Sequence, residues 1–227
     1  VVPIVMAAQS RPLLHDIGWL VAENARLREL YGRARQDSLV DGLTELGNHR
    51  AFQEELARQL DFAVRSGTWL SLLLIDVDDL KRVNDERGHA SGDELLASLG
   101  RTVTASLRRN DRAFRVGGDE FAIVLPGADV DTGLIVARRI LAGVLNGGEP
   151  TRPTEPFSVS IGVSSFPSPS TKGALLYRHA DAALYWCKRH GRTNAAAYDP
   201  GRHGVSADDR SLEDLSSAIG TVLAGGM

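Results

Sequence analysis

The sequence contains one cysteine, Cys187, which excludes a disulfide framework within the chain. This scarcity fits a reducing compartment, so we expect the protein in the cytoplasm. No apolar run approaches the roughly 20 residues that span a bilayer. The apolar opening Val1–Ala8 is short and lacks the basic start of a signal peptide. The net charge of -3 provides no basic surface for nucleic acid, although a few Lys and Arg side chains can still bind a small anion.

The 227 residues, 43% of them apolar, suit one well-cored domain with appendages. The chain begins with Val, and we expect residues 1–10 to be the end of an upstream segment of a longer protein. A trimmed N-terminus is the alternative interpretation. The Gly- and Ser-rich stretch 200–227 is predicted to be either a C-terminal tail or the start of a further domain.

Residues 11–40 carry a heptad pattern, and we expect a helical coiled-coil stalk there. The two apolar seams are Leu13, Leu20, Leu27 and Ala34, and Ile17, Asn24, Tyr31 and Ser38. A polar residue such as Asn24 in a seam can fix the register of a parallel coiled coil. The alternative is an amphipathic helix that packs on its own domain.

Residues 41–199 are predicted to form an α+β domain with a central, mostly antiparallel sheet flanked by helices. The apolar run WLSLLLI at 69–75 is typical of a buried central strand. The other expected strands are 113–116, 121–125, 157–164 and 195–198, and the expected helices are 50–65, 92–109, 129–145 and 172–190.

Two acidic clusters follow strands of this domain. Asp76–Asp79 ends the central strand, and Asp119 and Glu120 follow a predicted hairpin turn at Gly117 and Gly118, whose glycines permit a positive φ. If the two strands are neighbours, the carboxylates meet at one end of the sheet and suit Mg²⁺. Taken singly, each cluster also fits a simpler interpretation, a solvated turn for Asp78 and Asp79 and a plain hairpin loop for the other.

Five motifs occur in order between residues 41 and 198. They read DGLTELGNHRAF (41–52), DVDDLKRVND (76–85), GGDEF (117–121), SIGV (160–163) and DAALYWCKRHGR (181–192). Together they resemble the GGDEF family of diguanylate cyclases, whose catalytic core is similar to the palm of nucleotide polymerases and to adenylyl cyclases. The sequence departs from the family pattern at Glu45 (usually Gly), at His49 (usually Arg) and at Trp186 and Cys187, and we interpret Cys187 as a core residue.

The resemblance implies a metal site for Mg²⁺ or Mn²⁺, with two ions per active site. Asp76 and Glu120 would bind metal, assisted by the Val77 carbonyl. Asp119 would bind the second metal or help to deprotonate the 3′-hydroxyl, and the division of labour between Asp119 and Glu120 stays open.

The resemblance also implies a GTP site, with Asn84 and Asp93 as readers of the guanine. A carboxylate can accept from the guanine N1–H and N2–H₂ edge, whereas an amide both donates and accepts. Lys81 would contact phosphate. Lys188 and Arg192 would share a helix face toward the triphosphate if the helix continues through Gly191. The simpler interpretations are a turn or cap at Asn84 and a solvated basic helix end at Lys188. We expect His89 to position its loop.

Arg108 and Asp111 form an R-x-x-D motif that ends shortly before the GGDEF signature. In the family this motif resembles an inhibitory site for cyclic di-GMP, and Arg139 is a candidate secondary contact. Taken alone, the same residues fit a basic helix end followed by a turn.

These resemblances predict a homodimer in which two GTP molecules condense to cyclic di-GMP and two pyrophosphates, controlled by an upstream sensor domain. One rival is a regulatory module that binds nucleotide without catalysis, but its signature would be degenerate. Another rival makes a mixed cyclic dinucleotide, and Asp93 argues against it.

Overall fold

The structure of the protein is a computed structural model that describes residues 20–21, 23–26, 28, 39–146, 157–168, 170 and 173–203. The chain divides into two compact units, Val1–Leu39 and Val40–Met227. In the first unit residues 20–21, 23–26 and 28 are helical, whereas Leu39 has no regular structure. The remainder of the predicted stalk, the upstream segment 1–10 and most of the stretch 200–227 lie outside the described residues, so these interpretations stay predictions.

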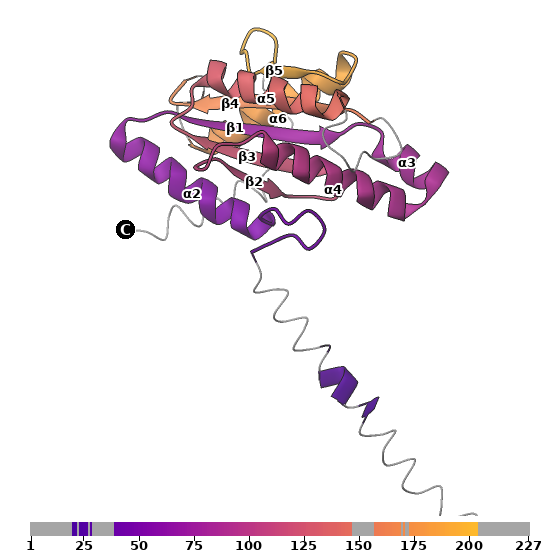
Figure 1. The fold of residues 1–227 in the computed structure, drawn as a ribbon. Coiled ribbons are helices and arrows are strands. Elements are labelled where there is room, and N and C mark those ends of the chain that lie inside the picture. Colours follow the sequence, from indigo (N-terminus) through magenta and orange to yellow (C-terminus); the bar gives the residue numbers. More distant parts are fainter. Residues whose placement is uncertain are drawn as a thin grey trace, which may run out of the picture. The chain divides into compact units, whose positions relative to one another are not determined.

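The second unit contains a five-stranded sheet in the order β2-β3-β1-β4-β5. Figure 1 shows β1 in the middle of this sheet. Every neighbouring pair is antiparallel except β4 and β5, which are parallel. This confirms the predicted α+β class. The strands are β1 (Leu70–Val77), β2 (Arg112–Arg115), β3 (Glu120–Pro126), β4 (Val159–Phe166) and β5 (Ala195–Ala197).

The apolar run of β1 is explained by burial on both faces of the sheet. Leu70, Leu72 and Leu74 pack with residues of α2 (His49–Ser66) and α6 (Gly173–Arg189). Alternate residues such as Leu73 and Ile75 pack in a second cluster with α4 (His89–Ala105) and α5 (Val130–Leu145). Because side chains alternate along a strand, Asp76 projects on the same face as Leu74 and therefore toward α6.

The segment after β1 differs from the sequence prediction. A short helix, α3 (Leu80–Arg87), precedes α4, and α4 runs from His89 to Ala105 rather than over 92–109. Gly88 separates the two helices with a positive φ of 84°, a conformation that glycine adopts at little cost. The motif DVDDLKRVND thus spans a strand end and most of a short helix, whereas the apolar periodicity had indicated only the longer second helix.

Capping side chains set where two of the helices begin. Asn48 precedes α2 and accepts a hydrogen bond from the Ala51 amide, and Asp129 precedes α5 and accepts one from the Thr132 amide, at 3.0 and 2.9 Å. Such side chains satisfy amides that have no partner within the helix. Within the described ranges, no helix has the length and hydropathy needed to cross a membrane.

Candidate active site

The two acidic clusters meet at one end of the sheet, as predicted. Asp76, near the end of β1, is the direct register partner of Glu120, the first residue of β3. One residue further on, the Val77 amide donates to the Asp119 carbonyl oxygen at 3.1 Å. The antiparallel pairing of β1 with β3 therefore brings together the backbone of the three predicted metal-binding acids.

Asp76 is the buried member of this group, with 5% of its surface exposed. Burial raises the pKa of Asp76 to about 6, although the hydrogen bond and charge of Lys188 lower it, and the negative charges of Asp119 and Glu120 raise it further. The Lys188 Nζ atom lies 2.6 Å from Asp76 Oδ2. The site is thus a crowded negative region in which Lys188 from α6 supplies a positive charge.

The hairpin between β2 and β3 turns differently from our expectation for its glycines. Positive φ values occur at Gly67, Gly88, Gly127 and Gly191, and not at Gly117 or Gly118. Gly117 leaves space for the present Glu120 side chain, because a Cβ atom at position 117 would lie 2.7 Å from Glu120 Oε2 and the carboxylate would have to move. Gly117 therefore lets the Glu120 side chain fold close to the backbone of the turn.

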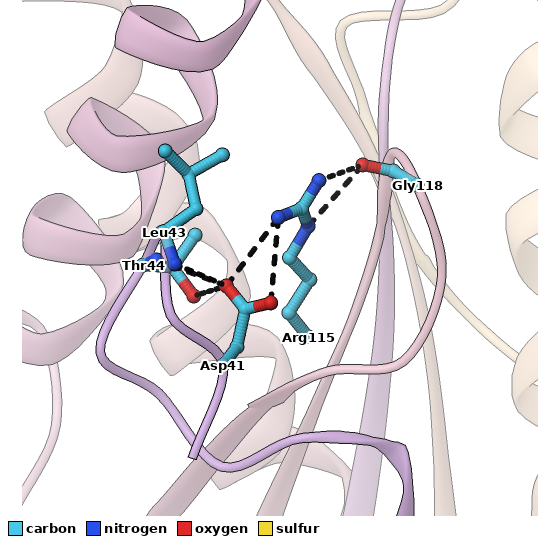
Figure 2. A network of polar contacts seen from close by, with 5 residues as sticks. All are labelled: Asp41, Leu43, Thr44, Arg115 and Gly118. Atoms are coloured by element: carbon cyan, nitrogen blue, oxygen red, sulfur yellow. Dashed lines mark hydrogen bonds and ion pairs between the residues drawn. The ribbon is translucent and has the colours of Figure 1, made fainter. Parts of the chain in front are cut away.

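A polar network outside the predicted metal-binding acids holds this hairpin in place (Figure 2). The Asp41 carboxylate accepts hydrogen bonds from the Thr44 amide and hydroxyl at 2.9 and 2.7 Å. Arg115 Nη1 lies 3.3 Å from Asp41 Oδ1, and Arg115 Nη2 donates to the Gly118 carbonyl oxygen at 2.8 Å. The motif around Asp41 was recognised in the sequence, but no role was predicted for Asp41, because its partner Arg115 lies 74 positions away in the sequence.

Asp78 is a buried residue whose carboxylate binds other parts of the protein. Its side chain is buried and accepts hydrogen bonds from the hydroxyls of Ser158 and Ser160 at 2.7 and 2.8 Å, and from the Thr193 amide at 3.1 Å. The solvated-turn interpretation of Asp78 is therefore wrong. Asp79, in contrast, is an exposed residue with a left-handed φ of 55°.

Lys188 and Arg192 both lie near the acidic cluster, but not on one helix face as the sequence predicted. The helix ends at Arg189, and Gly191 has a φ of 101°, so Lys188 and Arg192 do not share a continuous helix face. Arg192 nevertheless lies beside the β1 end, with its Nη2 atom 3.9 Å from Asp79 Oδ1. Both cations thus flank the carboxylates, one from the helix and one from the following loop.

The predicted guanine readers lie on the α3–α4 pair. Asn84 is in α3, and its Oδ1 atom is buried without a hydrogen-bond partner among the described residues. A Cβ atom at Gly92 would collide with this Asn84 side chain, so glycine at position 92 makes room for the observed Asn84 conformation. Asp93 is the next residue of α4 and is exposed, as are Lys81 in α3 and His89 at the start of α4. An unpartnered buried acceptor is what a ligand N–H group can satisfy.

The acids suit a metal that takes part of its coordination from a nucleotide. Within the described ranges, no group of three His, Cys, Asp or Glu side chains forms a ready-made metal cage. Mg²⁺ is usually bound by one or two carboxylates together with substrate phosphates and water. The register pair Asp76 and Glu120 supplies carboxylates of this kind, and Asp119 adds a third acid at the same strand end.

The R-x-x-D motif forms a tight turn after α4. The Arg108 amide donates to Asp111 Oδ2 at 2.9 Å, and the Asp111 amide donates to the Arg108 carbonyl oxygen at 3.1 Å. The two residues line a surface hollow together with Thr132 and other residues of α5 and the loop before it. Arg139, also from α5, donates to the carbonyl oxygen of Ser106 at the end of α4. The turn interpretation is confirmed, and the Arg108 side chain remains exposed above it.

Cys187 is a core residue, as the sequence predicted. Its side chain is fully buried in α6, and its thiol donates to the Ile161 carbonyl oxygen of β4 at 3.5 Å. Burial raises the pKa of Cys187 to about 11, so the thiol stays protonated at neutral pH.

Comparison with known proteins agrees with this geometry. Residues 38–194 match the family described as "Diguanylate cyclase, GGDEF domain". The chain is 32% identical over 182 residues to the probable diguanylate cyclase DgcC of Escherichia coli and 39% identical over 174 residues to the diguanylate cyclase DosC of the same species. These alignments cover 80% and 73% of this chain but only 48% and 36% of the relatives, so the chain spans about half of their length or less. The chain belongs to the GGDEF family.

Solved structures lead to the same family. The GGDEF domain of DgcB from Caulobacter crescentus in complex with c-di-GMP superposes with a TM-score of 0.66 at 32% identity, covering 71% of this chain and 96% of that one. A longer DgcB structure, comprising its coiled coil and GGDEF domain, has the same TM-score and covers 82% of this chain and 98% of that chain. This second similarity extends beyond the GGDEF domain, in line with the predicted coiled-coil stalk.

Proposed function

We propose that this chain is a diguanylate cyclase that condenses two molecules of GTP into cyclic di-GMP and two pyrophosphates. The observation that carries the proposal is the placement of Asp76 opposite Glu120 on adjacent strands, beside Lys188, in a chain of this family. This arrangement presents carboxylates for metal and a cation for phosphate at one strand end, which phosphoryl transfer requires. The domain proposed to do this is 41–199, following a stalk at 11–40.

The metal site proposed for Mg²⁺ or Mn²⁺ consists of Asp76, Glu120 and the Val77 carbonyl, with Asp119 as a further ligand or as the group that receives the 3′-hydroxyl proton. When bound, two such ions would activate the attacking oxygen and neutralise charge on the leaving group. The protein's own contribution is to hold these acids on a rigid strand pair. Asp76 is buried in the core, and Arg115 fixes the turn from which Glu120 projects.

The nucleotide site proposed for GTP extends from the α3–α4 pair to the end of α6. Asn84, with its unpartnered Oδ1 atom, would accept from a guanine N–H group, and Asp93 would accept from the N1 and N2 edge. Adenine lacks this pattern of donors and would leave both acceptors unpaired, which favours GTP. Lys81, Lys188 and Arg192 would contact the phosphates.

The product requires two copies of the chain. In each half of the reaction the 3′-oxygen of one GTP attacks the α-phosphorus of the other, the bond from that phosphorus to pyrophosphate breaks, and the 3′-hydroxyl proton is lost. A single nucleotide site per domain therefore completes the ring only when two domains face each other with two-fold symmetry. The stalk would bring them together under control of an upstream sensor, and binding of cyclic di-GMP at Arg108 and Asp111 would inhibit the enzyme.

The test is chromatography of the products after incubation of the purified protein with GTP and Mg²⁺, with Glu120→Ala as the inactive control. We expect cyclic di-GMP and pyrophosphate in a one-to-two ratio, and none in the variant. GTP binding without product would instead indicate a regulatory module. A product that incorporates adenosine from a GTP and ATP mixture would contradict the guanine readers.

A further inference from the structure

Asp78 has every part of its carboxylate engaged by the protein. Oδ1 accepts from the Ser160 hydroxyl at 2.8 Å, whereas Oδ2 accepts from the Ser158 hydroxyl at 2.7 Å and from the Thr193 amide at 3.1 Å. The Asp78 amide also donates to the Ser158 carbonyl oxygen at 2.9 Å. This residue directly follows the proposed metal ligands, yet its oxygens face β4 and the loop after α6.

The loop that Asp78 contacts has an unusual backbone. Gly191, Arg192 and Thr193 have successive positive φ values of 101°, 56° and 48°. Residues with a Cβ atom adopt this left-handed region at a cost, and two in succession persist only where the surroundings hold them. The Arg192 amide donates to the Cys187 carbonyl oxygen at 3.0 Å, and the Thr193 amide donates to Asp78. The second bond links the loop to the end of β1.

The position of the loop gives this link a functional consequence. Arg192 is in the loop itself, and Lys188 lies on the last turn of α6 immediately before it. The Arg192 side chain is exposed, and its Nη2 atom lies 3.9 Å from Asp79 Oδ1, a distance too long to fix the guanidinium by itself. The conformation of the backbone at residues 191–193 therefore decides where the guanidinium stands relative to the carboxylates.

We infer that Asp78 is a positioning residue that fixes the 191–193 loop, so that Arg192 is held beside the acidic strand end to receive the phosphates of the nucleotide. This inference rests on the proposed function. In this role Asp78 contacts neither metal nor nucleotide, because it is buried and both of its carboxylate oxygens already accept hydrogen bonds from the protein.

Asp78→Ala removes all three acceptor contacts and is the disrupting variant. We expect its affinity for 3′-deoxy-GTP, which binds but cannot react, to fall about tenfold, the effect of one lost contact to a charged group. Affinity for guanosine, which has no phosphate, should change less than twofold. The Thr193 amide should exchange its hydrogen faster than in the wild type. Unchanged affinity for 3′-deoxy-GTP would overturn the inference.

Asp78→Asn distinguishes positioning from charge. Its amide oxygen can still accept from Thr193 and Ser158, while its NH₂ group donates to the Ser160 hydroxyl. We therefore expect nucleotide affinity near that of the wild type. A loss as large as in Asp78→Ala would mean that the negative charge itself is needed, and would overturn the positioning role.

Two further variants separate positioning from stability. The double variant Ser158→Ala, Ser160→Ala keeps the Thr193 bond, so it should lower the melting temperature and leave 3′-deoxy-GTP affinity within twofold. Replacing the peptide bond between Arg192 and Thr193 by an ester removes the same N–H from the loop side and, unlike proline, leaves the positive φ of Thr193 possible, so it carries the test if Asp78→Ala does not fold. It should reproduce the tenfold loss, and unchanged affinity would contradict the inference. A wild-type protein that binds 3′-deoxy-GTP but makes no product from GTP contradicts the proposed cyclase activity alone.

Discussion

Asp41 and Arg115 lie 74 positions apart in the sequence, and their side chains form an ion pair at 3.3 Å. Although burial alone would raise it, hydrogen bonds from Thr44 and the nearby Arg115 guanidinium hold the pKa of Asp41 below its usual value. Arg115 also donates to the Gly118 carbonyl oxygen. Arg115 therefore links the turn at Asp41–Thr44 to the hairpin turn that precedes Asp119 and Glu120.

Arg115→Met should therefore loosen the hairpin without removing a proposed ligand. We expect about a tenfold loss of cyclase activity and a loss of about 1–3 kcal/mol in the free energy of unfolding, since one partner of a partly buried charged contact is left unpaired. Unfolding by urea and product formation from GTP measure the two effects. Arg101→Met, at an exposed position of α4, is the matched control and should change neither. Full activity in the Arg115 variant would show that the hairpin holds its shape unaided.

Glu45→Gly should stabilise the protein. Glu45 has a left-handed φ of 60° at the position where the family usually has Gly. Glycine removes the steric cost of this conformation but loses more entropy on folding, so we expect a net gain of about 0.5–1 kcal/mol. The check is the melting temperature, with Glu54→Gly in the middle of α2 as the control. The control change should lower the free energy of unfolding by about 1 kcal/mol. A loss of similar size for Glu45→Gly would contradict the proposal that the left-handed conformation of Glu45 is strained.

Asp76→Asn should abolish product formation and stabilise the fold at neutral pH. The raised pKa of about 6 means that the folded protein binds a proton more tightly than the unfolded chain, whose value is 3.8. Wild-type stability should therefore fall as the pH rises from about 4 to above 6, by at most about 3 kcal/mol from this group. The variant should lack that portion of the pH dependence. Denaturant unfolding of both proteins across this pH range, without nucleotide, tests whether stability falls as the pH rises. A variant less stable than the wild type at pH 7.5 would contradict the prediction.

Arg108→Ala should remove product inhibition and retain activity. Arginine can bind guanine O6 and N7 or a phosphate, and the Arg108 side chain is exposed over the turn closed by Asp111. A titration with cyclic di-GMP should show micromolar binding by the wild type and none by the variant. Arg109→Ala, the exposed neighbour, is the control and should bind as the wild type does. If cyclic di-GMP inhibits the wild type and both variants equally, the R-x-x-D motif has only the structural role of a turn.

The features predictable from sequence were those with local signals. The continuous apolar run of β1 and the Gly-Gly turn indicated two buried strands, and their pairing brings Asp76 opposite Glu120 as expected. Helix α3 was missed because its eight residues carry only two buried apolar side chains, Leu80 and Val83, too few for a periodic apolar pattern, and the predicted helix began only at residue 92. Similarly, i,i+4 spacing grouped Lys188 with Arg192, although Gly191 ends the regular backbone between them.

Asp78 illustrates what no local pattern could provide. Beside Asp79 it has the composition of a solvated turn, but its hydrogen-bond partners are 80, 82 and 115 residues away in the sequence. Burial of a carboxylate is favourable only when such partners exist. Their presence depends on the way β4 and the loop after α6 are brought to the end of β1, which is a property of the tertiary fold.

The two outer strands of the sheet have a bearing on how copies of this protein meet. An uncovered edge strand is a template for pairing with another chain. Here the outer side of β2 is partly covered by Gly47, which exchanges backbone hydrogen bonds with Ala113 and Arg115, and at the other edge β5 is only three residues long. The proposed reaction needs two copies to meet at their nucleotide sites rather than along their strands. Blunted edges of this kind disfavour pairing between strands, so they would leave that encounter as the favoured one and would lower the risk of aggregation.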